Sequence, residues 1–202
     1  VQRLQQDEAG RALVQRVRDA ERKLGGGEEL TAAVARNFYK LLAYKDEFEV
    51  ARLFAEPGFD KALADNFEGD YRLNFHITLP WSRGATPGAE PKKIRFGPWL
   101  LPAMKLMARF KFLRGTALNP FGRIPERIQE RALIADYEIT LSRILDQLNV
   151  DTHATAIALA SLPETIRGYS PVKERSVIAA RAKQAELMAN YKESVLEGRS
   201  AA

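Results

Sequence analysis

Apolar residues recur at every third or fourth position along most of this 202-residue chain, and this spacing restricts its possible folds more than any other feature. It is the period of an α-helix that buries one face. It predicts long helices over residues 3–24, 30–55, 125–148 and 170–195. The residues predicted to face inward are Leu13, Val17, Ala20 and Leu24; Val34, Phe38, Leu41, Tyr44, Phe48, Ala51 and Ala55; Ile134, Tyr137, Leu141, Ile144 and Leu148; and Ile178, Ala182, Ala185 and Ala189.

Shorter helices are predicted between these long ones. Pro98 suits the first turn of a helix, and residues 99–113 are apolar nearly all round, which predicts a core helix buried on several sides. Asp151 is a suitable N-cap for a helix that runs through Leu162. A further short helix is expected around residues 61–67. Together the segments predict a mainly α fold, a helical bundle.

One segment has the period of a β-strand. Tyr71, Leu73, Phe75 and Ile77 alternate with polar residues, and residues 92–96 can form the partner strand of a small hairpin or short antiparallel sheet. His76 falls on the polar face of this strand. We therefore interpret it as a solvated surface histidine and not as a catalytic one.

The absence of cysteine excludes disulfides, thiolate zinc sites, cysteine nucleophiles and cysteine-ligated iron–sulfur clusters on this chain. The two histidines, His76 and His153, are far apart in the sequence, so we expect no metal site. No nucleophile motif is complete. Gly69-Asp70-Tyr71 lacks the third glycine of the magnesium motif of thiamine diphosphate enzymes, so neither catalytic nor cofactor-binding residues are predicted.

Three consecutive glycines, residues 25–27, follow the first helix. The acids Glu28 and Glu29 come next, without the Lys-Ser/Thr of a phosphate loop, so a flexible linker is the favoured interpretation. The predicted organisation is a linking helix and Gly-rich linker over residues 1–29, followed by a helical domain over residues 30–202.

Positive charge is concentrated in one part of the chain. Residues 83–114 contain eight Lys/Arg and one acid, a net charge of +7, whereas the whole chain has +5. An ordinary structural role is the favoured interpretation, and the second is an anion-binding or partner surface, for which the candidate residues are Lys92, Lys93, Arg95 and Arg114. Nucleic acid is disfavoured, because Lys105 and Arg109 share one helix face while Lys111 and Arg114 fall on the opposite one.

The chain shows no sign of a membrane location. No segment approaches the roughly 20 apolar residues that a membrane span needs, and the first residues lack the apolar stretch of a signal peptide. A cytoplasmic location is therefore expected.

Several strings of this sequence resemble one known family. They are residues 35–53 (ARNFYKLLAYKDEFEVARL), 67–71 (FEGDY), 96–99 (FGPW), 111–116 (KFLRGT) and 162–169 (LPETIRGY). They are similar to the C-terminal region of the long, fused bacterial indolepyruvate ferredoxin oxidoreductases, in the 2-oxoacid:ferredoxin oxidoreductase family. The likeness covers roughly residues 30–190, and the first helix resembles the segment that joins this region to the preceding domain.

The resemblance implies a parent enzyme that oxidatively decarboxylates aryl 2-oxoacids to acyl-CoA. It implies thiamine diphosphate, magnesium and iron–sulfur clusters in the parent, with ferredoxin as the electron acceptor and coenzyme A as the acyl acceptor. Those cofactor motifs belong to earlier domains of the family, so no catalytic residue is carried over to this chain and no cofactor is expected on it.

Two hypotheses from different classes follow. The first is an accessory C-terminal domain that contacts other domains or subunits of such an oxidoreductase. The second is a free-standing module that binds an anion, a nucleotide or a protein through Lys92, Lys93, Arg95 and Arg114.

Overall fold

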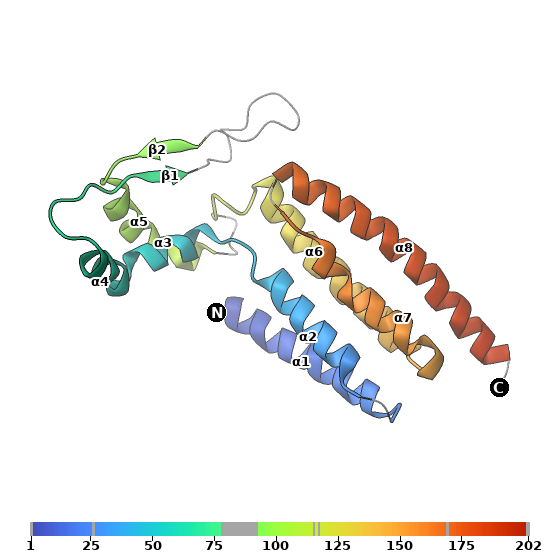
Figure 1. Ribbon diagram of the computed structural model, residues 1–202. Coiled ribbons are helices and arrows are strands. Elements are labelled where there is room, and N and C mark those ends of the chain that lie inside the picture. Colours follow the sequence, from blue (N-terminus) through green and yellow to red (C-terminus); the bar gives the residue numbers. More distant parts are fainter. Residues whose placement is uncertain are drawn as a thin grey trace. The chain divides into compact units, whose positions relative to one another are not determined.

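The structure is a computed structural model that describes residues 2–25, 27–77, 93–114, 116, 118–168 and 170–200. Its α-helices are α1 (Gln2–Arg22), α2 (Glu29–Leu42), α3 (Glu47–Ala55), α4 (Pro57–Asn66), α5 (Leu100–Arg109), α6 (Pro125–Leu145), α7 (Val150–Ser161) and α8 (Ser170–Ser200) (Figure 1). Short 3₁₀ helices, η2 (Phe110–Leu113) and η3 (Leu162–Thr165), follow α5 and α7. Strands β1 (Phe75–Ile77) and β2 (Ile94–Phe96) pair antiparallel. The prediction of a mainly α fold with a small hairpin is confirmed.

The chain divides into two compact units, and one is inserted into the sequence of the other. Unit 1 consists of Val1–Tyr44 together with Ile128–Ala202, and unit 2 consists of Lys45–Arg127. The predicted boundary between residues 29 and 30 does not coincide with this division, because α1 packs against α2 across it within unit 1. A linking role for residues 1–29 in a longer protein stays a prediction.

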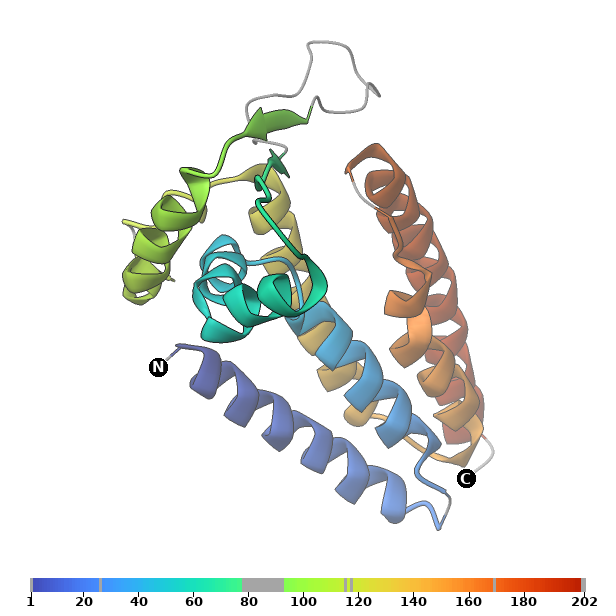
Figure 2. The same cartoon turned by 60° about the vertical axis from the view of Figure 1, so that its left-hand side comes forward.

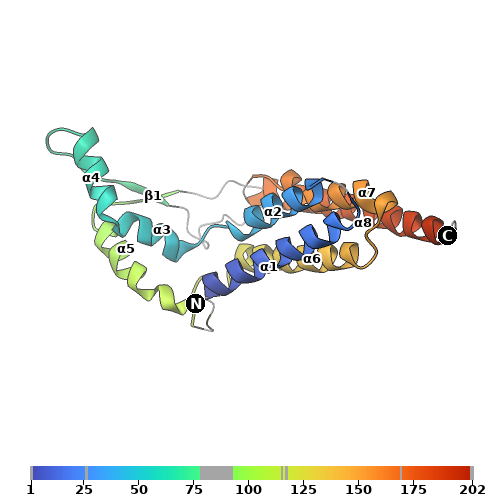
Figure 3. The same ribbon diagram turned by 90° about the horizontal axis from the view of Figure 1, so that it is seen from below.

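Unit 1 is a helical bundle. Figures 1 to 3 show α1 beside α2 and α7 beside α8 from three sides, and both pairs are in contact. Tyr137 of α6 lies at the centre: its ring stacks on Phe38 of α2 with centroids 6.2 Å apart, and its hydroxyl donates to the carbonyl oxygen of Ala160 over 2.8 Å. Tyr191 of α8 donates in the same way to the carbonyl oxygen of Ile144 over 2.7 Å. The aromatic residues thus join helices by their rings and by satisfied hydroxyl groups.

The helix stripes of unit 1 are buried as predicted in three helices out of four. Residues predicted to face inward and found buried include Leu13, Val17, Val34, Phe38, Leu41, Ile134, Tyr137, Leu141 and Ile144. The prediction for the last helix is wrong. Ile178 is 69% exposed and Ala182, Ala185 and Ala189 are also exposed, whereas the buried side chains of α8 are Val177, Ala180, Tyr191 and Val195. The buried residues share one face of α8, and Ile178, Ala182, Ala185 and Ala189 lie on a different face of the same helix, which is exposed.

Unit 2 is smaller and built around α3. This helix packs against α5, with Phe48, Ala51 and Met104 buried. Phe54 of α3 meets Phe59 of α4 and Phe75 of β1 edge to face, at centroid distances of 4.9 and 5.5 Å. Three aromatic rings therefore connect α3, α4 and the hairpin.

The hairpin is confirmed but shorter than predicted. Its register pairs Phe75 with Phe96, His76 with Arg95 and Ile77 with Ile94. His76 is exposed, as the alternation predicted, and residues 71–74 do not join the sheet. Lys92 of the predicted partner strand lies outside the described residues.

Two helix boundaries differ from the prediction because of capping. The predicted helix over residues 30–55 is divided into α2 and α3, since Asp46 caps a new helix by accepting from the N–H of Phe48 and Glu49 over 2.9 and 3.3 Å. The N-cap of α7 is Asn149 and not Asp151. Asn149 and Thr152 form a capping box, which satisfies two terminal N–H groups at once.

None of the helices in the described ranges has both the length and the apolar composition that a bilayer crossing requires. The cytoplasmic location stays a prediction.

Candidate docking surface

Helix α5 presents apolar residues on two opposite faces. Its inner face packs on α3 through Met104, which is 6% exposed. On the other side Trp99, Ala103, Leu106 and Phe110 follow one another at intervals of four, three and four residues, so they share one face of the helical turn. Trp99 is the N-cap residue of α5, and Phe110 is its C-cap residue and the first residue of η2. We call these four residues the outer stripe.

The outer stripe is exposed in the structure. Trp99 is 61% exposed, Leu106 55% and Phe110 43%, and Ala103 is exposed as well. Phe112 of η2, 68% exposed, extends the apolar surface, with its ring centroid 6.0 Å from that of Phe110. The prediction that residues 99–113 form a helix buried on several sides is therefore wrong, because one side of α5 is exposed among the described residues. Clustered exposed aromatic and aliphatic residues of this kind are typical of protein contact sites.

Basic residues lie in the same segment of the chain as the outer stripe. Residues 93–114 contain six Lys/Arg and no Asp or Glu. Lys93, Arg95, Arg109 and Lys111 are exposed, and Lys105 pairs with Asp60 of α4 over 3.0 Å. The segment that carries the stripe is thus cationic.

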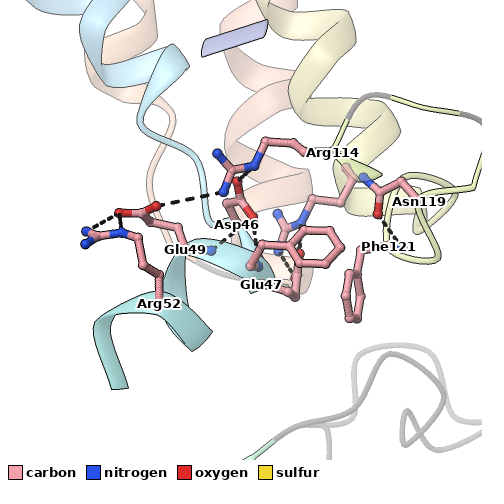
Figure 4. A network of polar contacts seen from close by, with 9 residues as sticks. Asp46, Glu47, Glu49, Arg52, Arg114, Asn119 and Phe121 are labelled. Carbon is pink, nitrogen blue, oxygen red and sulfur yellow. Dashed lines mark hydrogen bonds and ion pairs between the residues drawn. The ribbon is translucent and has the colours of Figure 1, made fainter. Parts of the chain in front are cut away.

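Arg114 has a different environment, which Figure 4 shows. Its Nε lies 2.6 Å from Asp46 Oδ2, and its terminal nitrogen lies 3.8 Å from Glu49 Oε2. Asp46 is the N-cap of α3, so one carboxylate both caps the helix and neutralises Arg114. Only 25% of the Arg114 side chain is exposed. The guanidinium therefore joins the end of η2 to the start of α3.

A second ion pair and an aromatic contact complete this network. Glu47 pairs with Arg127 over 2.9 Å, Phe48 meets Phe121 edge to face at 5.4 Å, and Asn119 accepts from the N–H of Phe121 (Figure 4). The carboxylate of Glu49 accepts two hydrogen bonds from Arg52, which raise the pKa of that guanidinium. The network fixes the first turn of α3 to the segment that follows α5, and it thereby supports the helix that carries the outer stripe.

The structure separates the residues of the predicted anion or partner surface. Lys93 and Arg95 are exposed on and beside β2, whereas Arg114 faces the carboxylates of α3. The pairing of Arg114 could not be read from the sequence. The outer stripe was also missed, although its signal was present: a helix apolar on nearly every side, in a segment without acids, was interpreted as core.

Three titratable groups of unit 1 join its helices: Glu21, His153 and Lys40. Glu21, 1% exposed, accepts from the N–H of Leu30 and Thr31 over 2.7 and 2.8 Å and thereby caps α2. His153, in the first turn of α7, lies 2.8 Å from the same carboxylate. Lys40 donates to the carbonyl oxygens of Pro163, Glu164 and Ile166, and burial lowers its pKa.

The residues do not fit the cofactors that the resemblance implies for the parent enzyme. Iron–sulfur clusters need thiolate ligands, and the chain has no cysteine. Within the described ranges, no three His, Cys, Asp or Glu side chains come together as a metal site. Asp70 is exposed in the loop before β1.

Comparison with protein families gives one match, to a model described as a family of unknown function (DUF6537), over residues 10–186. Neither the curated proteins nor the solved structures contain a match. The family match covers α2 to α7 and most of α1 and α8, so it includes both units.

Proposed function

Since the chain belongs to the DUF6537 family, whose function is unknown, we propose its function from the resemblance and from the exposed surface of α5. The chain is a non-catalytic accessory domain of an indolepyruvate ferredoxin oxidoreductase. Its parent oxidatively decarboxylates aryl 2-oxoacids to acyl-CoA and passes the electrons to ferredoxin. Thiamine diphosphate, magnesium and the iron–sulfur clusters belong to other domains of that parent.

The strings that carry the resemblance support a structural role. Residues 35–53 and 162–169 meet where Lys40 donates to the carbonyls of η3 and where Arg36 pairs with Glu164 over 3.1 Å. In unit 2, Arg114 from the string 111–116 pairs with Asp46 from the string 35–53. The residues that resemble the family thus hold helices together, which is the expected role of a domain without its own active site.

The observation that carries the proposal is the outer stripe. A domain that works alone gains nothing from an exposed tryptophan, leucine and phenylalanine on one helix face, whereas a domain that binds its neighbours needs such a surface. An accessory domain that positions or assembles other domains is therefore the function that the geometry favours.

The proposal is tested on the natural full-length protein that contains this chain. We expect its coding region to continue into thiamine-binding and cysteine-rich domains, and the purified protein to reduce ferredoxin with indolepyruvate and coenzyme A. Residues 1–202 expressed alone should be colourless and should not bind thiamine diphosphate with magnesium in a calorimeter. A start codon directly before Val1, or tight magnesium-dependent binding of thiamine diphosphate by the isolated chain, would overturn the proposal.

The alternative is a free-standing module that binds anions or nucleotides. The exposure of Lys93 and Arg95 favours it, whereas the pairing of Arg114 with Asp46 and Glu49 removes one of its four cations from an open site. Titration with a nucleoside triphosphate distinguishes the two functions. Saturable binding that is lost in Lys93→Gln/Arg95→Gln would favour the alternative.

A further inference from the structure

We propose that the outer stripe of α5 binds an amphipathic α-helix with acidic flanks, contributed by another domain or subunit of the parent protein. The source of this helix rests on the proposed function. Its chemistry follows from the outer stripe and from the exposed cations of the hairpin, α5 and η2, independently of that function.

The spacing of the stripe points to a helix as the occupant. Trp99, Ala103, Leu106 and Phe110 lie at positions i, i+4, i+7 and i+11, the pattern by which one helix packs along another. From Trp99 to Phe110 the stripe runs for about 16 Å, the length of three turns of a partner helix. Ala103 lies between larger residues, so a side chain of the partner can approach the backbone of α5 there.

The charge around the stripe determines the chemistry of the occupant. Arg109 lies beside the stripe on α5, Lys111 follows in η2, and Lys93 and Arg95 lie on the hairpin; all four are exposed. Residues 93–114 contain six Lys/Arg and no acid, and Asp60 and Asp46 of other helices pair with only two of these cations, so a basic partner would meet a net positive charge. A helix with Asp or Glu beside its apolar face would instead have complementary charges on approach.

The unit itself contains a matched control. Leu53 of α3 is 51% exposed and Leu106 is 55% exposed, and both are leucines of unit 2, but only Leu106 belongs to the stripe. Substitution of either by Asp changes charge and apolar area to the same extent. A difference between the two variants therefore reports on the stripe and not on exposed leucines in general.

Photo-cross-linking identifies the occupant directly. In the natural full-length protein, Leu106→p-benzoylphenylalanine is irradiated and the cross-linked peptide is identified by mass spectrometry. We expect one peptide from outside residues 1–202, with helical apolar spacing and flanking Asp or Glu. A cross-link to residues 1–202, to a basic or non-helical peptide or to lipid, or no cross-link at all, would overturn the proposal.

Hydrogen exchange measures how much the contact depends on the stripe. In the same protein, Leu106→Asp should raise the exchange of amides 100–109 by roughly tenfold or more, and Leu53→Asp should not. Equal effects of the two variants would contradict the proposal.

Neither the cross-linking nor the hydrogen-exchange measurement uses catalytic activity. A parent that fails to oxidise 2-oxoacids would therefore overturn the proposed function and leave this inference standing.

Discussion

His153 of α7 lies 2.8 Å from the carboxylate of Glu21 in α1, and this carboxylate also caps α2 through Leu30 and Thr31. One buried acid therefore connects three helices of unit 1. Burial by itself would raise the pKa of Glu21, but the hydrogen bonds from Thr31, His153 and Leu30 outweigh it and leave the pKa below 4.5.

The lowered pKa predicts a loss of stability in acid. Because the folded-state pKa of Glu21 lies below its unfolded value, this carboxylate stabilises the fold above pH 4.5 and the contribution is lost as the pH falls. Glu21→Gln should reduce the free energy of unfolding at pH 7 by about 1 to 3 kcal/mol and should flatten its pH dependence between about pH 5 and pH 3. Urea titrations over this range measure both effects. Glu8→Gln, on the exposed face of the same helix, is the control. An unchanged pH profile in Glu21→Gln would contradict the prediction.

The Arg114–Asp46 pair predicts a measurable coupling within unit 2. Arg114→Gln should lower the free energy of unfolding by about 1 kcal/mol, and Asp46→Ala should lower it by about 1 kcal/mol more because the N-cap of α3 is lost as well. A double-mutant cycle of the two should show that their effects are not additive. Arg123→Gln, at an exposed arginine, is the control. Additive effects would contradict the prediction, because they would show that Arg114 and Asp46 do not stabilise each other.

The exposed cations Lys93 and Arg95, together with Lys92, which lies outside the described residues, should matter for binding and not for stability. Replacement of Lys92, Lys93 and Arg95 by Gln should change the free energy of unfolding by no more than about 0.5 kcal/mol per residue. It should weaken assembly of the parent or its use of coenzyme A, and raised salt should have the same effect, since it screens such contacts over roughly 8 to 10 Å. Lys61→Gln, at an exposed lysine of α4, is the control. Unfolding of the triple variant, or unchanged assembly and kinetics at every salt concentration, would contradict the prediction.

Gly10 lies at the contact between α1 and α2, and Gly58 lies in open space on α4. Replacement by alanine is therefore expected to have opposite effects at the two positions. A Cβ at Gly10 would lie 2.9 Å from Cε1 of the buried Phe38 ring, whereas a Cβ at Gly58 of α4 would meet nothing within 4 Å. Gly10→Ala should therefore destabilise by about 1 kcal/mol, because overpacking outweighs the helix propensity that alanine gains. Gly58→Ala should stabilise by about 0.5 to 1 kcal/mol. Thermal unfolding compares them, and a more stable Gly10→Ala would show that Phe38 can move aside.

Local patterns in the sequence predicted much of the fold. The alternation of Leu73, Phe75 and Ile77 located the strand, and the stripe through Ile134, Tyr137 and Leu141 gave α6 its buried face. Such patterns depend on neighbouring residues alone. Capping was harder to predict, since Asn149 and Asp151 are both good N-caps and the choice depends on the side chain of Thr152, which completes the capping box.

The candidate site depends on contacts that no local pattern contains. The partner of Arg114 is Asp46, far away in the sequence, and nothing near Arg114 indicates it. An apolar helix such as α5 has the same composition whether its second face meets the core or another protein. The exposure of Trp99 and Leu106 became apparent only in the folded chain.

The insertion of unit 2 into unit 1 has a consequence for the order of folding during synthesis. All residues of unit 2 leave the ribosome in one continuous stretch, while unit 1 still lacks nearly all of α6 and the whole of α7 and α8. The hydrogen bond from Lys40 to the carbonyl oxygen of Pro163 cannot form until the chain is 123 residues longer. Domains fold as units, and contacts between residues distant in the sequence form late. We therefore expect unit 2, which carries the outer stripe, to fold first. The packing of α1 and α2 is completed only after α6, α7 and α8 have been synthesised.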